Sequence, residues 1–238
     1  MRTTLALSSA LLFIATLQAC SPLNCEKGKG DVTQRELTVA SFHGIAAQGS
    51  LEVRLTRGAT QNVKVEGQPN LIDLITTEVK DGVWHIGTKK CYNTDKTFII
   101  HITLPTIDFI SVQGSGDVKS SGSFTVPKLT VDVQGSGAVE MTADAKHIDA
   151  VVQGSGDITL KGSTGELSAT VQGSGDIDAD ELIASNADAT VQGSGDIAVN
   201  VTGLLSANVG GSGDINYTGT PTKVNKSVAG SGEVKQVR

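Results

Sequence analysis

A four-residue motif, Gly-Ser-Gly followed by an acidic residue in most copies, recurs along the second half of the chain and places a serine, and in most copies a carboxylate, at regular intervals. Its copies begin at intervals of 18 to 21 residues, at Gly114, Gly135, Gly154, Gly173, Gly193, Gly211 and Gly230. Serine hydroxyls can act as nucleophiles, and regularly spaced carboxylates can bind cations. Each chemistry needs partner groups that the rest of the sequence must supply.

The carboxylates of the motif form a column of Asp117, Asp157, Asp176, Asp196 and Asp214, continued by Glu233. This column has a passing likeness to calcium-binding glycine- and aspartate-rich repeats, but those repeats are nine residues long. Calcium needs six to eight oxygen ligands, and one carboxylate per motif provides too few. We therefore predict that these carboxylates accept backbone N–H groups, close turns and bind no metal.

The sequence lacks the other groups that an enzymatic reaction at these motifs would need. The four histidines, His43, His85, His101 and His147, have no Ser, Cys or Asp partner at a recognisable spacing, so the motif serines have no evident general base. Aromatic platforms for sugars are scarce, and we expect Phe42, Phe98, Phe109 and Phe124 to fill the core. We predict no catalytic residues, no cofactor and no enzymatic activity. A carbohydrate-active β-helix enzyme is the less favoured alternative.

Short runs of alternating apolar and polar residues flank every motif, as in Ile158-Thr159-Leu160 and Leu167-Ser168-Ala169. This period of two indicates strands with one buried face, and no repeat contains a helical stripe. Aligned repeats give two β-branched columns, one from Val112 to Val228 and one from Val118 to Val234. The sequence therefore predicts an all-β parallel solenoid, or β-helix, with about 19–20 residues per coil.

The motif glycines are expected to form the stacked turns of this solenoid. Glycine adopts positive φ without strain, and it allows the backbones of neighbouring turns to approach closely. We expect Gly175 to need glycine because of a positive φ angle, so that Gly175→Val destabilises the domain. Hydroxyls of the motif serines and amides of Gln113, Gln134, Gln153, Gln172 and Gln192 can bond to their counterparts in adjacent coils. The predicted structural turn residues are Gly114, Gly116, Gly135, Gly137, Gly154, Gly156, Gly173, Gly175, Gly193, Gly195, Gly211, Gly213, Gly230 and Gly232.

The first residues predict export. Arg2 precedes an apolar run from Leu5 to Thr16 that is too short to span a membrane. Leu17-Gln18-Ala19-Cys20 resembles the lipobox of bacterial lipoproteins, which implies cleavage before Cys20, lipid attachment to Cys20 and delivery to the outer membrane. An ordinary signal peptide cut near Ala19 is the alternative. Removal of residues 1–19 changes the formal charge from −6 to −7, which argues against nucleic-acid binding.

Two further cysteines, Cys25 and Cys91, remain if Cys20 carries lipid. An even number of cysteines in an oxidising compartment suggests a disulfide between them, with two unpaired thiols as the alternative. We predict a signal peptide over residues 1–19, a lipidated tether over 20–34 and one solenoid domain over 35–238. Within this domain, residues 35–110 form irregular first coils and residues 111–238 form regular ones. Gln48-Gly49-Ser50 is expected to be a degenerate copy of the motif.

The segments Phe42-His43-Gly44-Ile45, Leu51-Glu52-Val53-Arg54-Leu55 and Val63-Lys64-Val65-Glu66-Gly67, followed by the glycine motifs, resemble a known bacterial family. This family is called putative auto-transporter adhesin, head GIN domain. The resemblance covers residues 36–220 and implies a right-handed β-helical domain on envelope proteins. It implies an adhesin-like, non-enzymatic module with an unknown protein or polysaccharide partner, joined to the membrane by its lipid. A purely structural or accessory envelope protein is the alternative, and the oligomeric state is left open.

Overall fold

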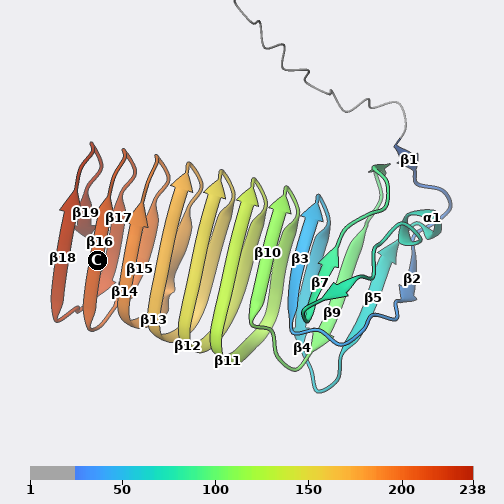
Figure 1. Cartoon of the computed structure of the whole chain (residues 1–238), viewed down its shortest axis with the longest axis horizontal. Coiled ribbons are helices and arrows are strands. Elements are labelled where there is room, and N and C mark those ends of the chain that lie inside the picture. The colour runs from blue at the N-terminus through green and yellow to red at the C-terminus, as the bar shows by residue number, and fades with distance from the viewer. Residues whose placement is uncertain (1–24, 238) are drawn as a thin grey trace, which may run out of the picture.

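A computed structural model describes residues 25–237, which form a β-solenoid of about seven turns with about 19 residues per turn (Figure 1). This architecture confirms the predicted fold class. The N-terminal part contains β1 (Glu26–Lys27), β2 (Thr33–Glu36), β3 (Gly44–Gly49), β4 (Glu52–Arg57), β5 (Asn62–Gly67), α1 (Pro69–Ile72), β6 (Val79–Lys80), β7 (Val83–Ile86), β8 (Tyr92–Asn93) and β9 (Ile99–Leu104). The regular part contains β10 (Phe109–Gly114), β11 (Asp117–Gly135), β12 (Ala138–Gly154), β13 (Asp157–Gly173), β14 (Ile177–Val191), β15 (Ile197–Val201), β16 (Leu204–Val209), β17 (Ile215–Gly219), β18 (Lys223–Val228) and β19 (Val234–Gln236).

The regular coils stack in parallel and in register. β11 pairs with β12, and β12 with β13, so that Val133 lies beside Val152 and Gly135 beside Gly154. Each coil has two arms: one leaves a Gly-Ser-Gly corner, and the other bends back and leads into the next corner. In Figure 1 the corners follow the strand arrow tips along one side of the stack.

The two β-branched columns are buried between the arms. Val112, Val133, Val152 and Val171 are fully buried in one arm, and Ile158, Ile177, Ile197 and Ile215 are 0–1% exposed in the other. They belong to one continuous core that extends from Phe42 to Tyr217. Stacked β-branched residues fill the narrow space between two pleated surfaces, and their burial drives the coils together.

The first coils do not stack in the order in which they occur along the chain. β3 pairs with β10 on one side and with β7 on the other, while β4 pairs with β11 and β9. The coil made by β3 and β4 therefore lies between a later coil, made by β7 and β9, and the regular repeats. Gln48 and Gly49 pair with Gln113 and Gly114, which confirms that Gln48-Gly49-Ser50 is a copy of the motif.

Antiparallel strands close the N-terminal end. β5 runs antiparallel to β9 and β2, and β6 antiparallel to β7. Helix α1 begins at Pro69, because proline suits the first helical position. Asn70 in this helix binds the N-terminal segment and accepts a hydrogen bond from Lys29 N at 2.8 Å. Among the described residues, no helix is long and apolar enough to cross a membrane.

The described part of the predicted tether lies against the domain. β1 pairs with β8, and β2 pairs with β5. Asn70 Nδ2 donates a hydrogen bond to Lys27 O at 2.8 Å, and Gln68 Nε2 donates one to Gly30 O at 3.0 Å. Residues 25–34 are thus part of the folded surface and do not serve as a free linker.

Candidate interaction surface

The corner glycines are in contact from coil to coil. The second glycine of each motif is buried or half-buried, whereas the serine between the two glycines is exposed in every copy. A Cβ on Gly175 would lie 2.8 Å from Gly156 N and 2.9 Å from Gly156 C, with Gly156 O closer still. These corners are built from backbone stacked on backbone, and a side chain has no room there.

Positive φ explains only part of this glycine requirement. Gly114, Gly135, Gly154 and Gly173, the first glycines of four motifs, have φ between 128° and 148°. The second glycines are not among the residues with positive φ. The prediction that Gly175 needs glycine because of its φ angle is therefore wrong, since close approach of the preceding coil is the cause.

The acidic column forms a hydrogen-bonded ladder between coils. One carboxylate oxygen of Asp176 accepts the backbone N–H of Asp196 at 2.7 Å, and Asp196 accepts that of Asp214 at 2.7 Å. Asp117, Asp157 and Asp214 make the same bond to the following coil, at 2.9–3.1 Å. The carboxylates do accept backbone N–H groups, but each serves the turn of the next coil and not its own turn.

These hydrogen bonds also explain how carboxylates of the same charge can lie next to one another in adjacent coils. The N–H of Glu233 and the ammonium of Lys235 lower the pKa of Asp214 because both groups favour the ionised carboxylate. Ala138 interrupts the ladder, and there Asp157 N donates to a backbone oxygen, that of Gly137, at 3.1 Å. No group of three or more His, Cys, Asp or Glu side chains within residues 25–237 is arranged to hold a metal ion.

The predicted side-chain ladder of glutamines is largely absent. Gln48 Nε2 donates to Gln113 Oε1 at 3.3 Å, and no other pair of glutamines is bonded in the described chain. Gln134 donates instead to Asp132 Oδ2 at 2.8 Å, along its own strand. The glutamine side chains therefore lie exposed on the outer surface, and the amides of Gln153, Gln172 and Gln192 make no hydrogen bond within the described chain.

The three cysteines differ in what the structure describes. Cys25 and Cys91 are joined by a disulfide, with their Cα atoms 4.6 Å apart. The bond fastens β1 to the segment that carries β8, and Glu26 N donates to Cys91 O at 2.9 Å beside it. Cys20, the predicted lipid attachment site, lies outside the described residues, as does the predicted signal peptide.

Three histidines have carboxylate partners that their sequence spacing did not reveal. His43 Nδ1 lies 2.7 Å from Asp108 Oδ1, and His101 Nε2 lies 3.3 Å from Glu66 Oε2. His147 contacts Asp149 through one ring nitrogen, at 2.7 Å, and Glu166 through the other, at 3.2 Å. Both nitrogens of His147 are therefore engaged, which leaves none to activate a serine.

The outer surfaces of the two arms differ in charge. We call the surface of the strands that lead into the corners face 1 and that of the strands that leave them face 2. Face 2 carries charged side chains in register, such as Arg54, Lys119 and Glu140. Face 1 consists mainly of short neutral side chains in three rows, and none of the residues in these rows is Lys or Arg. The rows are Gln48, Gln113, Gln134, Gln153, Gln172 and Gln192; Ala46, Ser111, Asp132, Val151, Thr170, Thr190, Asn208 and Ser227; and Gly44, Phe109, Thr130, Asp149, Ser168, Asp188, Ser206 and Asn225.

Phe109 is the exception in these rows. Phe42, Phe98 and Phe124 are buried as predicted, but Phe109 points outward and is half-buried. It packs over Gly44, whose Cβ would lie 2.9 Å from that of Phe109. Together with Ser111, Gln48, Gln113 and the β6–β7 hairpin, it lines a groove of about 360 Å³ on face 1. The prediction that Phe109 fills the core is wrong because its strand phase places it outside.

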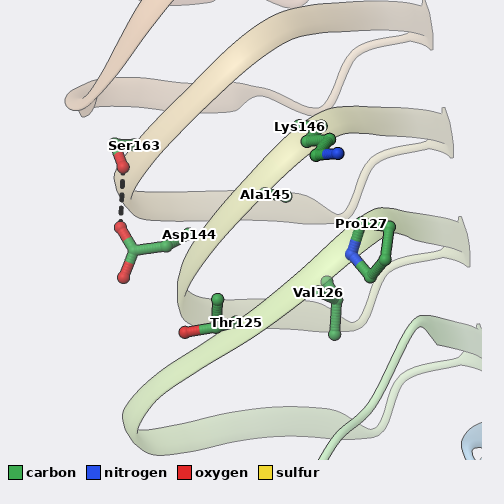
Figure 2. Close-up of a pocket in the computed structure, with 7 residues that line it drawn as sticks. All are labelled: Thr125, Val126, Pro127, Asp144, Ala145, Lys146 and Ser163. Atoms are coloured by element: carbon green, nitrogen blue, oxygen red, sulfur yellow. Dashed lines mark hydrogen bonds between the residues drawn. The ribbon is translucent and has the colours of Figure 1, made fainter.

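A second groove, of about 390 Å³, crosses β11, β12 and β13 where the arms bend (Figure 2). Val126, Pro127 and Ala145 supply apolar lining, and Ser163 donates a 2.7 Å hydrogen bond to Asp144. Ser123 donates a second bond of 2.7 Å from the preceding coil. These two hydroxyls lower the pKa of Asp144, so the carboxylate acts here as a bridge between coils. No sequence pattern singled out this cluster.

The fold and the outer surfaces first place the protein in a structural class. The chain is a parallel β-solenoid with backbone-packed glycine corners, whose outer positions carry polar groups. Residues 41–221 match the family described as putative auto-transporter adhesin, head GIN domain, and the chain belongs to this family.

Solved structures of bacterial proteins share the architecture. A putative adhesin from Bacteroides fragilis is 29% identical, with a TM-score of 0.84 over 89% of this chain and 99% of its own. A putative adhesin from Parabacteroides distasonis is 28% identical, with a TM-score of 0.74 over 90% of this chain and 100% of its own. A putative lipid binding protein from the same species is 26% identical, with a TM-score of 0.75 over the same shares. None of the curated proteins matches the chain.

Proposed function

We propose that the chain is a non-enzymatic, lipid-anchored protein of the cell envelope that contacts a surface partner through face 1. Its adhesin-like family and the putative adhesins among its structural relatives support this role. The engagement of both His147 nitrogens and the coil-bridging role of Asp144 support a non-enzymatic function. Cys20 is the proposed anchor, and the outer membrane the proposed location.

The neutral chemistry of face 1 carries the proposal and favours a polysaccharide partner. Nucleic acids require rows of basic groups, which face 1 lacks. Protein interfaces depend on Trp, Tyr and Arg at their centres, but Trp84 is fully buried and Tyr217 is 7% exposed. Amides and hydroxyls at regular spacing match the hydroxyl groups of a repetitive neutral glycan. Phe109 adds one apolar surface beside them.

A matched pair of substitutions on one strand tests the role of face 1. Thr170 lies on face 1 and Thr159 on face 2, and both are half-buried threonines of β13. A strain that lacks the protein should attach poorly to its surface or partner cells. The chain with Thr159→Lys should restore attachment, and the chain with Thr170→Lys should not. Equal restoration by both variants would exclude face 1 as the contact surface. Normal attachment by the deletion strain would favour an accessory envelope role.

The anchor requires a separate test. Cys20→Ser should move the protein from the membrane fraction to the soluble periplasmic fraction, because the proposed anchor is covalent lipid. Cys91→Ser is the matched control, since it removes a cysteine without removing the anchor and should leave the protein in the membrane fraction. Absence of palmitate labelling of the unmodified protein, with unchanged fractionation of Cys20→Ser, would contradict the lipoprotein assignment.

A further inference from the structure

The C-terminal coil of the described chain has an unpaired side. β18 pairs with β16, and β19 with β17, but no described strand pairs with their outer edges (Figure 1). Val228 is 46% exposed, whereas Val209 at the same position one coil earlier is 2% exposed. Such an end offers free backbone groups and apolar side chains, the features that promote pairing between sheet edges.

Lys226 occupies an inward position in this coil. The register aligns it with Ala207, and that column continues through Ala189, Ala169 and Ala150. A lysine thus replaces a small apolar residue at the point where the core reaches solvent. Its ammonium crosses to the other arm and donates a hydrogen bond to Val234 O at 2.7 Å. The same nitrogen lies 5.2 Å from the ring centroid of Tyr217, a cation–π distance.

The opposite end of the solenoid has a different protection. There the parallel stack ends in antiparallel strands, and the outermost strand, β2, is exposed at every residue and carries Arg35 and Glu36. Arg35 is also paired with Asp73 at 2.7 Å. A C-terminal coil has no matching parallel edge to join at this end. We therefore expect association through the C-terminal coil to join two C-terminal ends.

We propose that Lys226 terminates the solenoid: its ammonium closes the end of the core and prevents a second copy of this chain from docking there. Stacking another strand layer on β18 and β19 would bury this ammonium, and burial of a charge without a full set of partners is strongly unfavourable. In a symmetric C-to-C pair the two Lys226 side chains would also face each other. Inward-pointing charges protect the edges of natural sheets in this way.

Sedimentation velocity of the full chain in mild detergent, at concentrations up to about 100 μM, tests this role. Lys226→Met keeps the aliphatic stem over Tyr217 and removes the charge. We expect this variant to form dimers at least tenfold more tightly than the unmodified chain does. Lys223→Met is the matched control, because Lys223 lies on the same strand but on the outer face. It should remain monomeric, as should Lys226→Arg, which keeps the charge.

Each alternative result overturns a defined part of the proposal. A folded Lys226→Met chain that stays monomeric, with Lys226→Ala behaving likewise, would show that Lys226 does not prevent docking. Dimers of the unmodified chain as tight as those of the variant would lead to the same conclusion. Assemblies larger than dimers would refute the C-to-C geometry, since the N-terminal end would then be joined as well. Circular dichroism establishes that each variant is folded.

Discussion

Replacement of Gly175 by alanine tests the claim that the corners are held by backbone-to-backbone contact. Gly175 is the second glycine of its motif, and it is buried against Gly156 of the preceding coil. The added Cβ would lie 2.8 Å from Gly156 N, whereas ordinary contacts begin at 3.4 Å. The two coils must therefore separate locally by more than about half an ångström to accept one methyl group.

That separation affects specific hydrogen bonds. Ser174 N and Gly175 N both donate to Gly154 O, at 2.7 and 3.1 Å, and Asp176 N donates to Asp157 Oδ1 at 3.1 Å. Each such bond contributes about 0.5–1.5 kcal/mol, and overpacking of a rigid site costs about 1–3 kcal/mol. With partial loss of the bonds we expect a destabilisation of about 3 kcal/mol. For a chain of this size that corresponds to a melting temperature lower by about 6–12 °C.

Gly210→Ala provides the matched control for a thermal melt followed by circular dichroism. Gly210 is also a corner glycine without positive φ, but its added Cβ would meet Val191 O at an ordinary 3.7 Å. Alanine there should be neutral or stabilise by up to about 1 kcal/mol, because it restricts the unfolded chain. If Gly175→Ala melts within a degree or two of Gly210→Ala, the coils are more compliant than this reasoning assumes, and close approach does not explain the glycine.

Three further predictions concern the ladder, the disulfide and pH. Asp176→Ala should lower the melting temperature by about 2–4 °C, because the backbone N–H of Asp196 loses its acceptor. Asp176→Asn keeps an acceptor oxygen and should lower the melting temperature less. Equal effects of the two variants would count against the ladder. Cys91→Ser should destabilise the chain by about 2–4 kcal/mol, and a melt unaffected by reductant would contradict this. The hydrogen bonds to Asp144 lower its pKa in the folded chain. The ionised carboxylate therefore contributes its full stabilisation of the fold above the pKa of Asp in the unfolded chain, about 3.9, and this contribution is lost as pH falls through the lower folded pKa. In an acid titration, Asp144→Asn should therefore flatten the dependence of stability on pH below about pH 4.

Periodic features of the sequence predicted the regular coils accurately. The valines that precede each corner all point inward, because parallel in-register stacking places equivalent residues of every repeat on one side of the sheet. The corner glycines followed from the same repetition, although the physical reason given for Gly175 was wrong. A sequence motif reports that glycine recurs at a position, but it does not show whether φ or a neighbouring backbone requires it.

The irregular N-terminal coils show where prediction from sequence stops. Nothing local to β3 or β4 indicates that their coil lies between β9 and β10, because this order depends on contacts between segments distant along the chain. The antiparallel cap formed by β5 and β2 is equally non-local. The pairing of His43 with Asp108, across 65 residues, could not be found from spacing for the same reason.

The interactions that determine the fold also explain why the partner is harder to identify than the architecture. The stack is held by backbone ladders, inward columns and corner glycines, and these positions vary little from coil to coil. Outward positions are not constrained in this way, as the change from Phe109 to Thr130 and Asp149 in one row of face 1 illustrates. We therefore expect outward positions that break the repeat to add specificity to the contacts that the regular rows of face 1 make. Phe109, beside its groove on face 1, is the clearest such break, and it is where substitutions should first be tested for an effect on attachment.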